Sequence, residues 1–286
     1  MTILALSPHL DDVAFSCGGT IAQLRKAGIP VVVATLFTGS VASPRGFALA
    51  CQTTKGIDRG VDYMALRRAE DQAAMAALGV DDYVHAPCVE APHRGYDSAT
   101  ALFDGVRRGD DGDGVVDVVG QLLAQVQPDL VLSPATLGQH VDHILTDAAV
   151  RVLCPPHRVL RYLDTPYVLR ASKAELAAVA GDRAIGLVDV GAGLRAKLDA
   201  CAAYASQLPF QFGGETRMRR TLATAPPWRG ALSRGSEGWI GHAPALLELT
   251  NLATLRGREP YVSFHALSCH ARLPEMLSSD VFFDQN

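Results

Sequence analysis

Residues 2–37, TILALSPHLDDVAFSCGGTIAQLRKAGIPVVVATLF, decide the fold. Thr2–Ser7 is a short apolar run that ends at a proline, which is typical of a buried strand. Thr20–Ala27 has the apolar spacing of a helix and is followed by Gly28, the residue type expected just beyond a helix end. Val31–Phe37 is a second continuous apolar strand. A strand, a helix and a strand with short connections form a βαβ unit, which predicts a parallel sheet covered on both faces.

The same alternation continues beyond this unit. Asp62–Leu78 predicts a helix with Asp62 as its N-cap and Gly79 as its end, and Tyr83–Val84 predicts a short strand. Further helices are predicted at 115–126, 141–153, 173–179 and 194–206, and further strands at 129–133, 159–163 and 184–190. The pattern indicates the α/β class, with a three-layer α/β/α, Rossmann-like, mostly parallel sheet and a loop-rich C-terminal portion.

Three segments have no clear period and are predicted as loops: residues 39–60, 91–114 and 207–245. Loops this long in a globular protein are usually functional, so we expect the inserts at 39–62 and 89–114 to shape the pocket. The sequence shows no repeat and no linker. We therefore expect a single domain over 1–286, in which 1–155 form the core and 156–286 complete the pocket.

Composition excludes several functional classes. The 26 Lys+Arg against 30 Asp+Glu give a net charge of -4, which offers nucleic acid no basic surface. No apolar run approaches the roughly 18 residues that a membrane span needs. The N-terminus lacks the basic segment of a signal peptide, and the six cysteines form no CxxC pair. We expect a cytoplasmic protein with reduced thiols. We expect its partner to be a small molecule and neither nucleic acid nor a membrane, and the sequence is compatible with a homo-oligomer.

The first group of chemically active residues is PHLDD, residues 8–12, directly after the first strand. In open α/β sheets, ligands bind at the carboxyl ends of the strands. His9 and Asp12 offer a nitrogen and an oxygen that suit zinc, and Asp11 is a candidate general base. The alternative is that one aspartate caps a helix and that His9 is an ordinary loop residue.

The second group is GQHVDH, residues 138–143, which also follows a buried strand and opens a helix. His140 and His143 are three residues apart, so they share a helical face, and one can bind a metal while the other faces the substrate. Asp142 is placed to hydrogen-bond an imidazole and fix its tautomer. The alternative is an ordinary polar helix start.

Together the two groups predict more than either does alone. Both follow strands of one parallel sheet, so they can meet in one crevice. His9, Asp12 and His143 then supply three ligands and leave a fourth position open, which is typical of a catalytic zinc site. Asp11 and His140 remain for proton transfer and charge stabilisation, the parts that metal-assisted hydrolysis needs.

With these motifs, the chain resembles the PIG-L/LmbE-like family of zinc-dependent deacetylases, which remove acyl groups from N-acylated amino sugars. The resemblance covers about the first 155 residues and rests on PHLDD, CGGT, VVVATLFTG, LRRAEDQAAMAALGV, DLVLSP and GQHVDH, in that order. Two later stretches, AAYASQ at 202–207 and SEGW at 236–239, resemble the family less closely.

The resemblance implies roles for the predicted site. His9, Asp12 and His143 correspond to the ligands of Zn²⁺, although other divalent first-row metals also suit this ligand set. Asp11 corresponds to the general base. His140 corresponds to the residue that stabilises the oxyanion and protonates the departing amine.

The resemblance also assigns residues outside the ligand set. Asp142 is implied to orient His140. Arg68, in the LRRAE helix, resembles a substrate-binding arginine; the alternative is a solvated charge paired with Glu70 or Asp71. Seven further residues are candidates for pocket contacts, with core packing or an ordinary loop position as the alternative: Phe210, Phe212, Trp228, Trp239, His242, His265 and His270.

The function implied is a metal-dependent N-deacetylase, an amide hydrolase that removes an acyl group, expected to be acetyl, from an N-acylated amino sugar or a sugar-bearing small molecule. Specialised-metabolite biosynthesis, such as that of an antibiotic, would suit it. The alternatives are a non-catalytic sugar-binding protein that keeps the fold, and an amidase acting on a non-sugar amide. Phosphate-ester hydrolysis has less support, because the chain has no P-loop and no GxGxxG motif.

Overall fold

The structure is a computed structural model that describes residues 1–224, 236–242, 245–246, 249 and 252. Trp228, His265 and His270, which the sequence offers as further pocket residues, lie outside the described residues. Within the described part, no helix is both long and apolar enough to cross a membrane.

The described strands form one seven-stranded sheet in the order β3-β2-β1-β4-β5-β7-β6. Neighbours from β3 to β5 pair in parallel, whereas β7 pairs antiparallel with both β5 and β6. The strands are β1 (Ile3–Ser7), β2 (Val31–Thr35), β3 (Tyr83–His85), β4 (Leu130–Pro134), β5 (Val159–Tyr162), β6 (Ala184–Asp189) and β7 (Ser236–Gly241). The expected mostly parallel sheet is confirmed, and the described strands of the C-terminal portion extend it.

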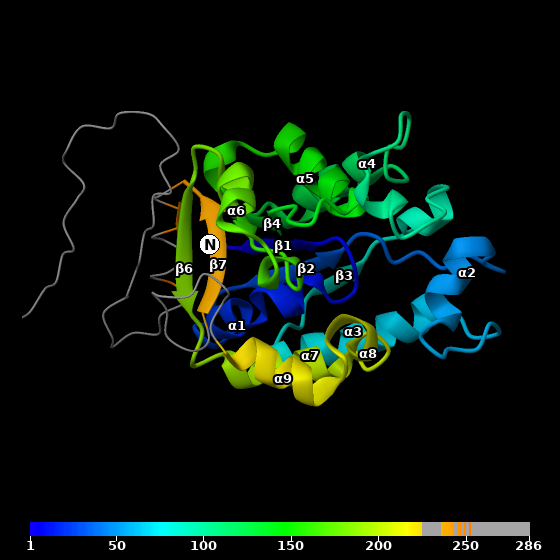
Figure 1. The fold of residues 1–286 in the computed structure, drawn as a ribbon. Helices are drawn as coiled ribbons and strands as arrows, with labels where there is room; N and C mark the ends of the chain where they lie inside the picture. Colours follow the sequence, from blue (N-terminus) through cyan, green and yellow to red (C-terminus); the bar gives the residue numbers. More distant parts are fainter. Residues whose placement is uncertain (225–235, 243–244, 247–248, 250–251, 253–286) are drawn as a thin grey trace, which may run out of the picture.

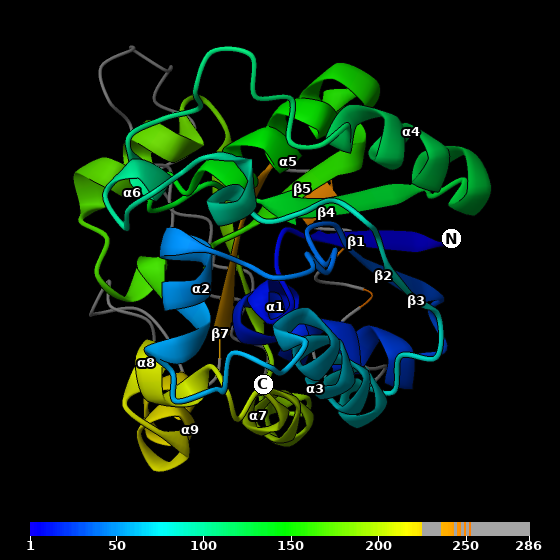
Figure 2. The same cartoon turned by 90° about the vertical axis from the view of Figure 1, so that its right-hand side faces the viewer.

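Helices cover both faces of this sheet, so the molecule has three layers (Figure 1). One face carries α1 (Asp12–Lys26), α3 (Tyr63–Leu78), α7 (Leu194–Ala203), α8 (Leu208–Phe212) and α9 (Glu215–Ala223). The other carries α4 (Val115–Val126), α5 (Val141–Leu153) and α6 (Lys173–Ala180). The turned view shows α2 (Gly46–Thr53) and α8 on the same side of the molecule (Figure 2).

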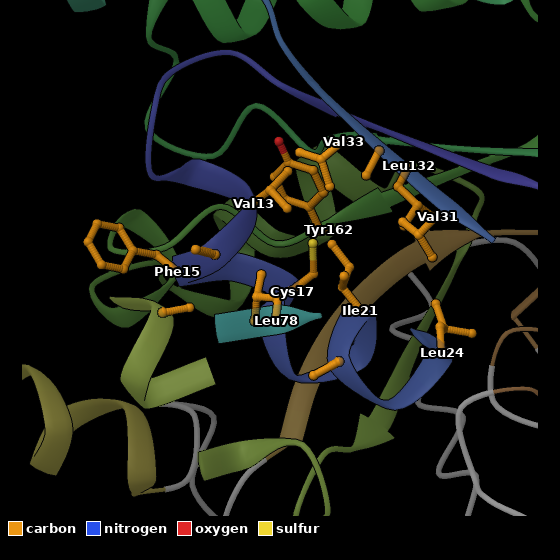
Figure 3. Packing of buried hydrophobic residues seen from close by; sticks show 14 of the residues in the cluster. Val13, Phe15, Cys17, Ile21, Leu24, Val31, Val33, Leu78, Leu132 and Tyr162 are labelled. Atoms are coloured by element: carbon orange, nitrogen blue, oxygen red, sulfur yellow. The ribbon is translucent and has the colours of Figure 1, made fainter. Parts of the chain in front are cut away.

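Helix α1 is central to the larger apolar core. Figure 3 shows Val13, Cys17 and Ile21 of this helix directed toward Val33 of β2 and Tyr162 of β5. Each such side chain stabilises the fold by roughly 1.5–3 kcal/mol when fully buried. The packing fixes the helix against the sheet, and with it the turn that precedes the helix.

A buried carboxylate holds a kink in α1. Cys17 has non-helical backbone angles, so the helix consists of two halves. Glu237 of β7 accepts hydrogen bonds from the amides of Gly19 and Thr20 at 2.8 and 2.7 Å, and from Lys197 Nζ at 2.7 Å. It thus caps the second half of the helix, where the helix dipole favours a negative charge.

Most predicted elements are confirmed. Asp62 caps α3 through the Ala65 amide at 2.9 Å, and Gly79 ends it in the left-handed conformation. Two predictions are wrong. Residues 39–60 contain the helix α2, and the loop expected at 207–245 contains α8, α9 and β7. Helix α2 has no capping side chain at its N-terminus, so the sequence carries no start signal for it.

Candidate active site

The two predicted motifs meet at one edge of the sheet. Strands β1 and β4 are parallel neighbours, with Ile3 opposite Leu130. The turn that holds His9 and Asp12 follows β1, and the start of α5, with His140 and His143, follows β4. Adjacent parallel strands end at the same edge, which brings residues more than 130 positions apart into one pocket.

Both motifs adopt unusual backbone conformations. Asp11 has φ 153° and ψ -27°, which a residue with a Cβ rarely adopts and which costs on the order of 1–3 kcal/mol. Before α5, Gly138 has φ 81°, and a Cβ there would collide with the ring of Tyr167. Backbone strain like that at Asp11 is common at functional sites, where it fixes side chains in position.

Donor atoms of three residues converge at the floor of the pocket. Asp12 Oδ2 lies 3.3 Å from His9 Nδ1 and 3.2 Å from His143 Nε2. His143 Nε2 is fully buried and has no hydrogen-bond partner. The third imidazole is close as well, because one nitrogen each of His9, His140 and His143 lie within 4.8 Å of one another. An unpartnered buried nitrogen facing a carboxylate and a second imidazole suits a divalent cation.

Two further carboxylates hold the imidazoles from behind. His143 Nδ1 lies 2.7 Å from Asp164 Oδ1, and His9 Nε2 lies 2.9 Å from Asp142 Oδ2. Each contact fixes the tautomer that leaves the opposite nitrogen facing Asp12 as a lone pair. Metal-binding histidines are usually held in this way.

The structure places Asp142 differently from the implied role. Its carboxylate contacts His9, whereas only its backbone amide donates to His140, at Nδ1 and 3.2 Å. Since Nδ1 accepts that hydrogen bond, neutral His140 carries its proton on Nε2.

The 89–114 insert reaches this floor through Arg94. Its guanidinium donates to Asp142 Oδ1 at 2.7 Å and to Asp110 Oδ1 at 2.9 Å. The amide of Ala91 donates to Asp142 Oδ2 at 3.2 Å. Asp142 is therefore fixed from the insert and itself fixes His9.

The carboxylates of the floor favour the protonated form of the two proposed ligand imidazoles. Burial by itself lowers the pKa of His143, but the carboxylates of Asp12 and Asp164 raise it to about 9. His9 follows the same pattern, because Asp12 and Asp142 outweigh burial and raise its pKa. A divalent cation would supply the charge that these imidazoles otherwise gain by protonation.

Asp11 and His140 stand beside this cluster with different electrostatics. Burial raises the pKa of Asp11 to about 7, although the charge of Arg67 opposes the shift. Burial and the nearby His9 lower the pKa of His140 to about 3. Among the described residues, the Asp11 carboxylate has Arg67 Nη2 at 3.8 Å as its ion-pair partner and accepts no hydrogen bond.

The arginine in the pocket is Arg67, not its neighbour. Arg67 pairs with Glu90, and its Nη2 donates to the carbonyl of Leu10 at 3.2 Å. Arg68 instead donates to the carbonyl of Thr38 at 2.6 Å and to Ser40 Oγ at 3.1 Å, and it does not line the pocket. It pairs with neither Glu70 nor Asp71, which contact Ser206 and Tyr204.

The cavity above the floor measures about 280 Å³. Its wall comes from both inserts and from α8, and includes Phe47, Lys55, Phe103 and Phe210. Phe212 and Trp239 are buried in the core, which confirms the alternative interpretation for these two residues. His242 does not line this cavity.

A sequence model described as PIG-L, GlcNAc-PI de-N-acetylase, matches residues 4–154, more than half of the chain. The chain belongs to the PIG-L family. Within this family, the 2'-N-acetylparomamine deacetylase of Streptomyces fradiae is 31% identical over 253 residues, which is 84% of each chain.

Solved structures agree with this assignment. The A40926 pseudoaglycone deacetylase matches with a TM-score of 0.67 and 27% identity, over 84% of this chain and 96% of that one. The zinc-inhibited form of a teicoplanin deacetylase matches with a TM-score of 0.69 and 25% identity, over 84% and 97%. These three similar proteins are deacetylases, so the predicted family and fold are confirmed and the chain is a hydrolase of amide bonds.

Sequence reasoning did not find Arg67, Glu90, Arg94 or Asp164 in this PIG-L site. A signal existed for Asp164, because it follows β5, the next parallel strand, just as the two predicted motifs follow β1 and β4. Arg94 and Glu90 lie in an insert without periodicity, and no local pattern marks their partners.

Proposed function

We propose that this chain is a zinc-dependent N-deacetylase that hydrolyses the acetamide of an N-acetylated amino sugar or a sugar-bearing small molecule. One observation carries the proposal: Asp12 Oδ2 lies 3.3 and 3.2 Å from nitrogens of His9 and His143, and the latter nitrogen is buried without a hydrogen-bond partner. The family and its deacetylase relatives support the same reaction.

His9, Asp12 and His143 would hold the zinc. When bound, zinc supplies Lewis acidity, which lowers the pKa of water toward ~7 and polarises a carbonyl group. Three protein ligands leave a position open, as catalytic zinc sites do.

Asp11 is the proposed general base. Its carboxylate lines the cavity next to the proposed ligands and accepts no hydrogen bond from the described residues. It is thus free to accept the proton that the attacking water loses. General bases work best when their pKa lies near the working pH.

His140 is the proposed oxyanion donor. Its Nδ1 accepts a hydrogen bond from the Asp142 amide, so the neutral ring carries its proton on Nε2, and the residue lines the cavity. The Nε2–H group can donate a hydrogen bond to the amide oxygen as negative charge develops there. Because the pKa of His140 is lowered to about 3, we assign protonation of the departing nitrogen to Asp11 in place of His140. The proton that Asp11 accepts from water passes to this nitrogen, which releases the amine and acetate.

We assign sugar binding to Arg67 and Glu90, in place of the role implied for Arg68. Both line the cavity and form an ion pair. Their remaining donors and acceptors suit the vicinal hydroxyls of a sugar ring. Biosynthesis of an antibiotic is the setting we propose, because the similar proteins are deacetylases of 2'-N-acetylparomamine and of the pseudoaglycone of the antimicrobial A40926.

A substrate screen tests the proposal. The full chain, stripped of metal and reloaded with zinc, is incubated with N-acetylated amino sugars and their glycosides, and both free amine and acetate are measured. We expect equimolar amine and acetate that disappear with a chelator and return with zinc. Binding without release would instead favour a sugar-binding protein, and release only from simple amides would favour a non-sugar amidase.

A further inference from the structure

One part of the pocket lining, which contributes none of the proposed ligands, has its own composition. We call this part the distal subsite. Its lining residues come from α2 and the turn after it, from Tyr63 of α3, and from α8 and the residue before it. They are Phe47, Ala50, Cys51, Thr54, Lys55, Tyr63, Gln207, Phe210 and Gln211. Among these lining residues only Lys55 is charged, so the subsite combines apolar and neutral polar side chains with one cation.

Lys55 differs from the other cations of the pocket in its partners. Its Nζ donates to Tyr63 Oη at 2.6 Å and to Gln207 Oε1 at 2.8 Å, and both acceptors are neutral. Arg67, by contrast, pairs with Glu90, and His9 pairs with Asp142. Over the part of the chain that the structure describes, Lys55 forms no ion pair. An ammonium has three donors, so one donor remains available. Its charge lowers the pKa of the Asp11 and Glu90 carboxylates without forming an ion pair with either of them.

The two acceptors are themselves fixed. Gln207 Nε2 donates to Tyr63 Oη at 2.9 Å and to Ser206 Oγ at 2.7 Å. Ser206 Oγ in turn donates to Glu70 at 2.6 Å, a carboxylate on the second turn of α3. This chain of hydrogen bonds orients Gln207 Oε1 toward Lys55 and holds the ammonium in one place. A pre-positioned cation loses little entropy when a ligand binds it.

Aromatic rings flank the ammonium. Lys55 Nζ lies 5.2 Å from the centre of the Tyr63 ring and 5.5 Å from that of Phe210. Phe210 is 74% exposed, an unusually large exposure for a phenylalanine beside a cavity. An exposed ring at a pocket mouth suits an apolar or aromatic part of a ligand.

We propose that the distal subsite binds a carboxylate carried on an aromatic or apolar part of the substrate, remote from the scissile amide. The Lys55 ammonium pairs with the carboxylate, and Phe210 and Phe47 contact the ring that bears it. This inference rests on the proposed function, which places the amide at the floor. It also defines a substrate class, because a polycationic amino sugar would meet an unpaired like charge in this subsite.

A matched pair of ligands tests the subsite. The probes are the para-carboxyphenyl and para-carbamoylphenyl glycosides of N-acetylglucosamine, which differ in charge but little in shape. Their dissociation constants are measured by calorimetry on full-length zinc-loaded protein carrying Asp11→Asn to suppress turnover, with and without Lys55→Met. The carboxylate should bind about tenfold tighter or more, as a charge-assisted hydrogen bond implies, and Lys55→Met should abolish this preference.

Two control variants complete the experiment. Lys55→Arg keeps the charge and should retain most of the preference, whereas Lys26→Met removes an exposed lysine at the end of α1 and should leave it unchanged. The proposal is overturned if the protein with Lys55 binds both probes equally or binds neither, or if the preference survives Lys55→Met.

The proposed function fails separately from the subsite. The protein with Asp11 intact is assayed for acetate release from both probes. If it releases none, while the Lys55-dependent preference is still measured by calorimetry, the deacetylase assignment is wrong and the anion subsite stands.

Discussion

Two parts of the pocket differ in how their polar groups are paired. The floor lies at the ends of β1 and β4, and the rim, which contains the distal subsite, is formed by α2 and α8. On the floor, carboxylates fix His9 and His143 at 2.9 and 2.7 Å; the His143 contact is buried and the His9 contact is partly buried. On the rim, Lys55 has only neutral partners and Phe210 is largely exposed. A fixed floor suits a constant reaction, whereas an open rim suits the choice of substrate. The predictions below test this division, from the largest effect to the smallest.

Replacing Asp11 should have the largest effect. Asp11→Ala removes the proposed base but none of the proposed ligands, so we expect turnover to fall by about 10²–10⁴ or more with zinc content unchanged. Amine release and metal analysis of the same samples measure both. Asp104→Asn, at an exposed position of the 89–114 insert, is the control. Near-full activity in Asp11→Ala would reject Asp11 as the base.

Removing the carboxylate behind His143 should weaken the metal site itself. Asp164→Ala frees the His143 ring, and zinc affinity should fall roughly 10–100-fold. Competition with a chelating indicator measures the affinity. Asp164 also accepts the amide of Leu137 at 3.0 Å, so Asp164→Asn, which keeps an acceptor, should retain more affinity. Unchanged zinc binding in both variants would contradict the positioning role.

Arg94 tests whether the insert contributes to the floor. Arg94→Met leaves Asp142 without its guanidinium partner, one step farther from the metal, so zinc affinity should fall by about threefold to tenfold. Arg94→Lys should restore part of it. Arg107, which contacts Asp97 and Gly95 in the same insert, supplies the control Arg107→Met. An equal loss in the control would mean that the insert acts only through its folding.

Phe210 should show the smallest effect, confined to substrate binding. With an aryl glycoside as the substrate, Phe210→Ala should raise KM about twofold to tenfold with kcat unchanged, since aromatic contacts contribute roughly 0.5–1.5 kcal/mol. Phe210→Tyr keeps the ring and should behave like the unchanged chain. A fall in kcat with KM constant would place Phe210 in the reaction and blur the division between floor and rim.

The floor could be predicted from sequence because the signals for it lie in short, continuous stretches of the chain. Each motif directly follows an apolar strand, and parallel strands end at one edge, so His9 and His143 had to lie close together. The partner of His9 could not be predicted, since Asp142 lies 133 positions away and its carboxylate could equally have faced His140. Arg67 and Arg68 differ by one position on a helix, and only the packing of α3 decides which one faces the pocket.

The rim was harder to predict for a physical reason. Helix α2 begins at Gly46, and the side chain of Arg45 at its N-cap position forms no capping hydrogen bond. Helix α8 is only five residues long. Short helices without caps are held by tertiary contacts, which sequence periodicity does not record. We propose that both halves of the chain form a single domain, since their described strands share one sheet. The cytoplasmic location and the oligomeric state stay predictions.

Zinc titration of the metal-stripped chain tests the central claim most directly, that His9, Asp12 and His143 together form one metal site. The unchanged chain should bind one zinc ion tightly, whereas His143→Ala should lose that binding while keeping the fold, as circular dichroism would show. If His143→Ala binds one zinc ion as tightly as the unchanged chain, the metal lies elsewhere and this account of the floor is wrong.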